Sequence, residues 1–315
     1  MPIDPRTTAF VFPGQGSQFV GMGKALAQTD PLAAEVFARA DFVLGLSLST
    51  LCWEGPAETL NDTVNTQPAL LTHSVAVLGA LQRRLPDFRP ALVAGHSMGE
   101  FSALVAAGAL GFEDALRLVL ERGRAMQAAG RQQPGGMAAI LGLEVEAVVA
   151  ACAQATAEAG AVVQLANDNC PGQLVISGDG AALDRALELL TATGAKKAVR
   201  LAVSIGAHSP LMQPAQERLN RALAGAGLAD PRIPIVGNVD AAQLETADAI
   251  RHDLEAQLTS RVRWTESIQA MRAAGVTTFV ELGAGNVLCG LIRRIDRAAV
   301  TLAVDAPESL AVLTA

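Results

Sequence analysis

A serine between two glycines, Ser97 in Gly95-His96-Ser97-Met98-Gly99, has the surroundings of a nucleophile. The run fits the G-x-S-x-G pattern, in which the serine sits on a sharp turn between a strand and a helix. Apolar residues predict a strand over 91–94, and the residues after the turn predict a helix over 98–107. The helix N-terminus would place backbone donors and a positive dipole end beside the serine oxygen. We expect Ser97 to be the nucleophile, the alternative being an ordinary glycine-rich turn.

A serine nucleophile needs a base, and the sequence offers four histidines. His73 falls within a long apolar helix and His252 in a charged stretch, so we expect a core residue and a solvated one. His96 flanks the serine, and we expect its side chain to point away from it. His208 follows a predicted strand and precedes Ser-Pro, a plausible helix start that would keep the imidazole neutral. We therefore expect His208 to be the base, although such a residue is often only part of a turn.

A cation on the apolar face of a predicted helix is the most informative charge. The helix is expected over 113–129, and Arg122 lies on its apolar line, which is formed by Ala115, Leu118, Val119, Met126 and Ala129. A guanidinium keeps its proton and needs an anionic partner when it is buried. Either a buried Asp or Glu supplies that partner, or a bound carboxylate does, and the residues alone leave both open.

The N-terminal loop GQGSQ, Gly14 to Gln18, lacks the signature of a nucleotide site. Phe19 stands where the dinucleotide fingerprint needs a third glycine, and no Gly-Lys-Ser/Thr ending follows. Such a loop can instead offer backbone N–H groups to a developing oxyanion. The histidines are isolated and the four cysteines are scattered, so no metal site is predicted.

The elements that must position these residues alternate between strand and helix, which predicts a parallel sheet covered on both faces. The rhythm changes after Pro134-Gly135-Gly136. Six elements then follow in the order β-α-β-β-α-β, the split βαβ unit, with ranges 137–143, 145–159, 162–166, 173–177, 181–193 and 197–203. We expect an α/β fold in which a large catalytic subdomain, 1–133 and 204–315, carries a ferredoxin-like subdomain at 134–203.

Composition excludes several classes of protein. Half of the 315 residues are hydrophobic and 17% are charged, which suits a folded α/β protein. The net charge of −7 and the absence of tyrosine argue against nucleic-acid binding. No apolar stretch is long enough to span a bilayer, and the N-terminus does not resemble a signal peptide. The cysteines are expected to be free thiols, so we predict a cytoplasmic protein that does not act at a membrane.

The motifs together resemble the malonyl-CoA:acyl carrier protein transacylases of fatty-acid synthesis and the related acyltransferase domains of polyketide synthases. The resemblance covers nearly the whole chain and rests on the order and spacing of FPGQGSQ, TQPAL, GHSMGE, RGRAMQ, ANDNCPGQ and AHSPLM. It implies an α/β-hydrolase-like large subdomain with a ferredoxin-like insertion. It also implies transfer of a malonyl group from coenzyme A to an acyl carrier protein, with no tightly bound cofactor and a monomeric enzyme.

The resemblance also implies a role for each site residue. Ser97 would be the nucleophile and His208 the base, with no acidic third member. The backbone carbonyl of Gln257 would orient the imidazole, and Arg122 would grip the malonyl carboxylate. The family pattern assigns the oxyanion hole to the backbone N–H groups of two residues and cleft-lining positions to two more: Gln15, Met98, Gln67 and Asn167.

One position departs from the family pattern, because Ala207 stands where many members carry Phe or Ser before the histidine. The smaller side chain leaves space beside the acyl C2 carbon. Malonyl is therefore the first expected substrate and methylmalonyl the alternative.

Two other functions compete, a G-x-S-x-G hydrolase and a carrier-docking subunit without catalysis. A hydrolase has no need for the core-facing arginine or the inserted unit, and a scaffold has no need for the serine and histidine. Two basic clusters are candidate docking sites for an acidic carrier, unless they are simply solvated: Lys196, Lys197 and Arg200, and Arg293 with Arg294.

Overall fold

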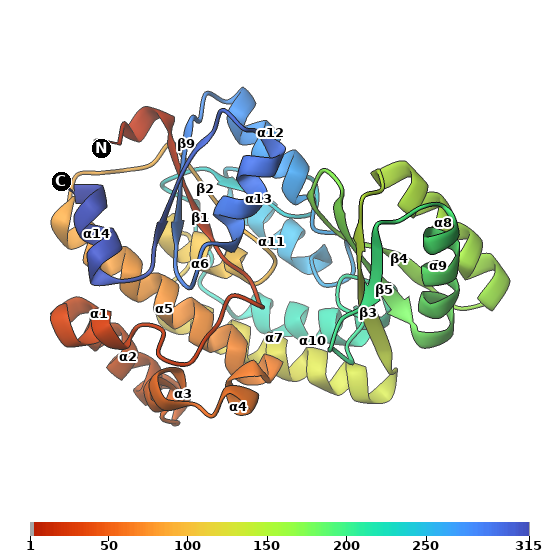
Figure 1. Cartoon of the computed structure of the whole chain (residues 1–315). Helices are drawn as coiled ribbons and strands as arrows, with labels where there is room; N and C mark the ends of the chain where they lie inside the picture. The colour runs from red at the N-terminus through yellow and green to blue at the C-terminus, as the bar shows by residue number, and fades with distance from the viewer. Residues whose placement is uncertain (1–2, 315) are drawn as a thin grey trace.

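The computed structural model describes residues 3–314, which form two β-sheets flanked by helices (Figure 1). The larger sheet has the strand order β10-β9-β1-β2-β7-β8. Its strands are β1 (Thr8–Phe12), β2 (Leu92–Gly95), β7 (Ile235–Val236), β8 (Gln243–Leu244), β9 (Thr278–Leu282) and β10 (Val300–Val304). All neighbours pair in parallel except β7 and β8. The sheet is therefore parallel as expected apart from its edge strand β8, because the short link between β7 and β8 allows only a hairpin.

Helices cover both faces of the larger sheet, as its apolar strands require. Alternate residues of β1 point to opposite sides: Phe10 and Phe12 join the core beneath α5 and α6, whereas Ala9 and Val11 join the core beneath α12 and α13. The helices are α1 (Lys24–Thr29), α2 (Pro31–Leu44), α3 (Leu48–Glu54), α4 (Ala57–Asn61), α5 (Thr63–Arg84), α6 (Gly99–Ala106), α7 (Phe112–Gln132), α8 (Val145–Ala159), α9 (Gly180–Ala192), α10 (Gln213–Ala224), α11 (Ala247–Ala256), α12 (Trp264–Ala273), α13 (Val287–Ile295) and α14 (Pro307–Thr314). None of these described helices is both long and apolar enough to cross a membrane.

The smaller sheet is antiparallel and has the strand order β4-β5-β3-β6. Its strands are β3 (Gly135–Leu141), β4 (Val163–Cys170), β5 (Gln173–Asp179) and β6 (Lys197–Arg200), and α8 and α9 pack on it around a separate apolar core. The β-α-β-β-α-β order agrees with the expected split βαβ unit. Strand β6 ends at Arg200, and residues 201–203, expected to continue it, are exposed. The exact boundaries of the inserted unit stay a prediction.

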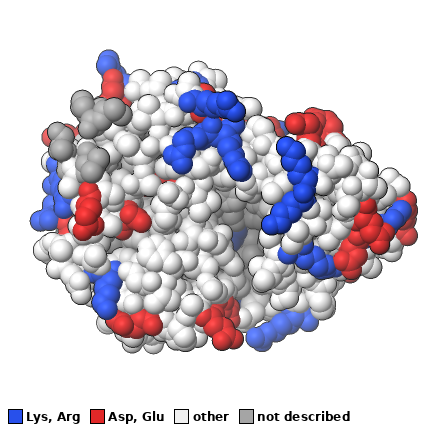
Figure 2. Space-filling model, viewed as in Figure 1, with Lys and Arg blue, Asp and Glu red and all other residues white. Residues whose placement is uncertain are grey.

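A cleft of about 1020 Å³ lies between the two sheets, and residues from both line it. The loop after β1 and the turn after β2 form its floor. Strand β4 and residues between 201 and 208 form one of its walls. The space-filling view shows this hollow between the larger and the smaller part of the molecule (Figure 2). Strand β4 ties the two parts together, because Asp168 donates its N–H to the carbonyl of Val262, and Val262 donates to Ala166.

Candidate active site

The turn between β2 and α6 holds Ser97 in a left-handed conformation, with φ of 51°. Backbone crowding explains the two flanking glycines. A Cβ on Gly95 would lie 2.0 Å from the carbonyl of Gly99, and a Cβ on Gly99 would lie 2.2 Å from the carbonyl oxygen of Phe12. Only glycine fits at either position, and the strained serine is typical of a nucleophile elbow.

His208 lies against the serine, with Nε2 at 2.8 Å from Oγ of Ser97. Its Nδ1 is 2.9 Å from the backbone carbonyl oxygen of Gln257 and 3.1 Å from that of Ser260. Because carbonyl oxygens only accept hydrogen bonds, Nδ1 carries the proton and Nε2 is free to accept one from the serine hydroxyl. Such a pair can activate a serine for attack on a carbonyl carbon.

The imidazole of His208 is neutral for reasons that differ from the helix N-terminus expected from the sequence. Burial and the nearby Arg122 cation lower the pKa of His208 to about 3. Both effects disfavour the imidazolium, the first through loss of solvation and the second through repulsion. His208 can therefore accept a proton at neutral pH.

Arg122 is 2% exposed on α7 and points at the serine. Its Nη2 lies 3.0 Å from Oγ of Ser97 and 3.0 Å from Oε1 of Gln257, and its Nη1 lies 2.9 Å from Oε1 of Gln67. No ion pair within residues 3–314 includes Arg122, and its Nε meets no acceptor there. Burial lowers the pKa of Arg122 to about 10. The sequence left open whether a buried Asp or Glu or a bound carboxylate pairs with Arg122. Among the described residues, no Asp or Glu is in direct contact with it.

The remaining residues expected from the sequence lie around this centre. Gln15, Met98, Asn167 and Ala207 line the cleft. Gln67 is fully buried and is hydrogen-bonded to three residues that line the cleft: Thr63, Arg122 and Met126. It therefore lies behind the cleft lining, and a direct contact of Gln67 with the substrate stays a prediction.

The other three histidines take no part in the contact with the serine. His73 is buried in α5, with Nε2 3.1 Å from the carbonyl of Asp305, and His252 is exposed, both as expected. His96 makes its side-chain hydrogen bond to Oδ1 of Asn169 at 2.8 Å. It lines the same cleft as Ser97, but its hydrogen bond is to Asn169 and not to the serine.

Comparisons with known proteins identify the family to which this chain belongs. The acyl transferase domain family matches residues 9–302. The chain belongs to this family. A relative from Bacillus subtilis (strain 168), named malonyl CoA-acyl carrier protein transacylase, is 48% identical over 96% of this chain and 94% of its own. The family resemblance seen in the sequence is confirmed.

Solved structures of family members share the whole fold. An acyl carrier protein S-malonyltransferase from Vibrio cholerae superposes with a TM-score of 0.93 at 44% identity, covering 98% of this chain and 99% of that one. A malonyl-transacylase in complex with a type II PKS acyl-carrier protein has a TM-score of 0.93 at 43% identity, with 98% of each chain covered. The α/β fold with its second small sheet is therefore that of the family.

Two buried polar residues support the elbow and were missed in the sequence. Asn238 accepts the N–H of Ser97 at 2.8 Å and donates Nδ2 to the carbonyl of Gly95 at 2.8 Å, so it braces both sides of the turn. Glu100, in the first turn of α6, accepts from the same Asn238 amide. The signal for Asn238 was its place just after a short buried strand, where ligand-binding residues of α/β sheets gather.

Within residues 3–314 no group of three or more His, Cys, Asp or Glu side chains is arranged to hold a metal ion. The four cysteines are buried free thiols. The polar side chains that meet at Ser97 are His208, Arg122 and the amides of Gln257 and Asn238, a set that suits acyl chemistry.

Proposed function

We propose that this protein transfers a malonyl group from coenzyme A to the phosphopantetheine thiol of an acyl carrier protein, through an ester on Ser97. The observation that carries the proposal is the placement of Arg122, a buried cation 3.0 Å from the serine oxygen and without a carboxylate partner among the described residues. An acyl group that ends in a carboxylate supplies that partner with two directed hydrogen bonds. The names of the relatives support the same substrate and acceptor.

In the first half-reaction, His208 accepts the hydroxyl proton of Ser97 while Oγ attacks the thioester carbonyl carbon. The negative charge that develops on the carbonyl oxygen would be held by the backbone N–H groups of Gln15 and Met98. Within residues 3–314 neither N–H donates to another residue, which supports this role. Collapse of the intermediate breaks the carbon–sulfur bond, and the coenzyme A thiol leaves with the proton from His208. The product is the malonyl ester of Ser97.

In the second half-reaction the carrier thiol enters the same cleft. His208 takes its proton, the thiolate attacks the ester carbonyl, and Oγ of Ser97 leaves with the proton that His208 returns. The carbonyl oxygens of Gln257 and Ser260 keep the imidazole in the tautomer that both steps need. Coenzyme A acts throughout as part of the substrate, and no tightly bound cofactor is required.

The acyl group next to the ester carbonyl would face Ala207, which lines the cleft beside the base. Its single methyl leaves room for a branch at C2, so methylmalonyl remains the alternative substrate. Competition between malonyl-CoA, methylmalonyl-CoA and acetyl-CoA in one transfer assay distinguishes these acyl groups. We further propose a cytoplasmic location, which the free thiols of the four cysteines support.

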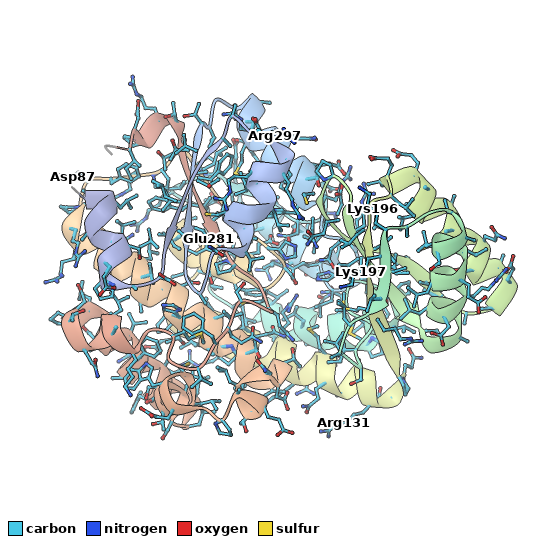
Figure 3. The ribbon with its side chains drawn as sticks, in the orientation of Figure 1. Asp87, Arg131, Lys196, Lys197, Glu281 and Arg297 are labelled. Atoms are coloured by element: carbon cyan, nitrogen blue, oxygen red, sulfur yellow. The ribbon has the colours of Figure 1, made fainter. Side chains whose placement is uncertain are left out.

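Acidic carrier proteins would approach along the basic residues beside the cleft (Figure 2). Arg293 and Arg294 lie exposed on α13, and Lys196 and Lys197, labelled in Figure 3, lie exposed at the start of β6. Arg200 is less suited to this role than its neighbours, because it is paired with Asp184. The cluster at α13 is therefore the better defined of the two.

Incubation with radiolabelled malonyl-CoA, with and without carrier protein, tests the proposed function. Label on the carrier is the expected result. Free labelled malonate as the main product would identify a hydrolase, and no labelled product would identify a docking subunit without catalysis. Either of those outcomes would overturn the proposal.

A further inference from the structure

Two buried carboxyl groups, neither of which lines the cleft, lie beside Asn238 and Val239 near the elbow. Glu100 on α6 is 0% exposed, and Asp253 on α11 is 5% exposed. Gly237 allows the side chain of Asp253 to lie against the backbone, because a Cβ on Gly237 would lie 2.4 Å from Oδ1 of Asp253. Two ionised carboxylates that interact directly in such an interior would repel each other strongly. The pair therefore needs a feature that removes one of the two charges.

The hydrogen bonds of the two groups identify that feature. Oε2 of Glu100 accepts from the side-chain amides of Asn238 and Gln257, the latter at 2.7 Å. Oδ1 of Asp253 accepts the N–H of Val239 at 3.1 Å. The other two oxygens, Oε1 of Glu100 and Oδ2 of Asp253, are buried and meet no donor within residues 3–314. A single proton between these two oxygens satisfies both and leaves one negative charge on the pair.

Burial and the neighbouring carboxyl agree with this arrangement. Burial first, and then repulsion from Asp253, raise the pKa of Glu100 well above its usual range. Burial also raises the pKa of Asp253, but the hydrogen bond with Glu100 and those from the backbone N–H groups of Val239 and Asn238 oppose this rise and favour its ionised form. The proton therefore belongs mainly to Glu100, and the charge mainly to Asp253.

Arg122 and Oε2 of Glu100 together determine how the side-chain amide of Gln257 is oriented. A guanidinium only donates, so the amide oxygen of Gln257 must face Arg122, to which it lies at 3.0 Å. Its NH2 group must then face acceptors, and it finds Oε2 of Glu100 at 2.7 Å and the carbonyl of Ser97 at 3.2 Å. The backbone carbonyl of the same Gln257 accepts from Nδ1 of His208. One residue thus contacts the arginine and the histidine, and Glu100 holds its side chain in place.

We propose that Glu100 is a positioning residue of the active site, which shares one proton with Asp253 and fixes the amides of Gln257 and Asn238. Through Gln257 it sets the places of Arg122 and His208, and through Asn238 it braces the N–H of Ser97. The kinetic part of this inference rests on the proposed malonyl transfer. The protonation of the pair does not, so the two can fail separately.

Substitution of Glu100 by Leu and by Gln tests the positioning role. Glu100→Leu leaves two buried amides without their acceptor, and we expect kcat/KM for acylation of Ser97 by malonyl-CoA to fall about 100-fold, with a smaller preference for malonyl over acetyl. Glu100→Gln keeps the acceptor as an amide oxygen and offers an N–H to Asp253 in place of the shared proton. It should therefore restore kcat/KM to within about threefold of the wild type.

Glu281 provides the matched control, because it is equally buried (labelled in Figure 3) and accepts from the N–H groups of Leu288 and Cys289 instead. Glu281→Leu should lower the melting temperature without changing the ratio of malonyl to acetyl acylation. If Glu100→Gln lost as much activity as Glu100→Leu, an ionised Glu100 would be required and the inference would be wrong.

Infrared spectroscopy tests the shared proton without any substrate. The difference spectrum between the wild type and Glu100→Gln at neutral pH should contain the C=O stretching band of a protonated carboxylic acid. This measurement tests the shared proton even if Glu100→Leu does not fold, because Glu100→Gln keeps the packing. Absence of the band would overturn the shared proton, whereas failure of the wild type to transfer malonyl would overturn only the proposed function.

Discussion

The NH2 group of Arg122 donates to Oγ of Ser97 at 3.0 Å, so the buried cation and the serine are hydrogen-bonded before any substrate arrives. The same oxygen lies 2.8 Å from Nε2 of His208. Together with burial, repulsion from this guanidinium lowers the pKa of His208. After acylation, a malonyl carboxylate would lie two bonds beyond the ester carbonyl carbon and within reach of the same cation. The cation that contacts the free serine can therefore pair with the carboxylate of the acyl group and select it.

Ser97→Ala should abolish the acyl-enzyme and leave the fold intact, because the change removes one oxygen from a turn that Gly95 and Gly99 continue to define. Brief exposure of the wild type to malonyl-CoA, followed by peptide mass spectrometry, should locate the adduct on the peptide that contains Ser97. An adduct on any other residue would contradict the assignment of the nucleophile.

The lowered pKa of His208 predicts a specific effect of acid on stability. The folded pKa of about 3 lies below the value of about 6.5 for an unfolded histidine, so the unfolded chain binds more protons between these values. The contribution of His208 to the free energy of unfolding is complete above pH 6.5 and is lost as the pH falls toward 3. At pH 5 the loss is at most about 2 kcal/mol.

Denaturant unfolding at pH 7 and pH 5 measures this effect. The loss of stability between the two values should be smaller in His208→Gln than in the wild type, because the variant has no group to protonate there. His252→Gln, at an exposed position, is the control and should lose as much stability as the wild type. An equal loss in all three proteins would show that His208 titrates normally.

The sequence predicted most of the strands near the site because buried strands are short apolar runs. The strand before Ser97 and the helix over 145–159 were placed within one residue. The apolar pattern did not predict where strands end when tertiary contacts determine their ends. Strand β6 stops at Arg200 because its apolar continuation lies exposed beside the cleft, and the antiparallel β8 has only two residues. Short helices such as α3 and α4 carry too few turns for an apolar period to be recognised.

Ser97, His208 and Arg122 were recognisable because each breaks a local pattern: a strained turn, a histidine before Ser-Pro, and a cation in an apolar row. Glu100 breaks no such pattern, and Asn238 is marked only by its place just after a short buried strand. Their importance depends on a hydrogen bond between segments 138 residues apart, which no local spacing reveals. Gln67 was placed in the cleft by the family pattern, whereas the structure shows it fully buried and bonded to residues that line the cleft.

Reversal of Arg293 and Arg294 to Glu should weaken transfer to the carrier while leaving acylation of Ser97 by malonyl-CoA unchanged. These side chains lie exposed on α13, where they would attract an acidic carrier, and they do not line the cleft. Arg124 and Arg221 are the matched control, because they are exposed elsewhere and their reversal changes the net charge equally. Carrier KM should rise at low salt only for the α13 variant. Equal carrier kinetics in the two variants would exclude this docking site.

Arg122→Ala should cut malonyl transfer severely and spare or raise acetyl transfer, because only the malonyl carboxylate can neutralise the buried guanidinium. Loss of a hydrogen-bonded charge partner in a closed site costs about 3–5 kcal/mol, which corresponds to discrimination of about 100-fold or more. Arg122→Lys should rescue only part of the activity, since an ammonium cannot reproduce the planar two-bond contact. Initial rates of Ser97 acylation with malonyl-CoA and acetyl-CoA measure the effect. If Arg122→Ala lowered both rates by the same factor, the arginine would support the fold of the site and would not select the acyl group.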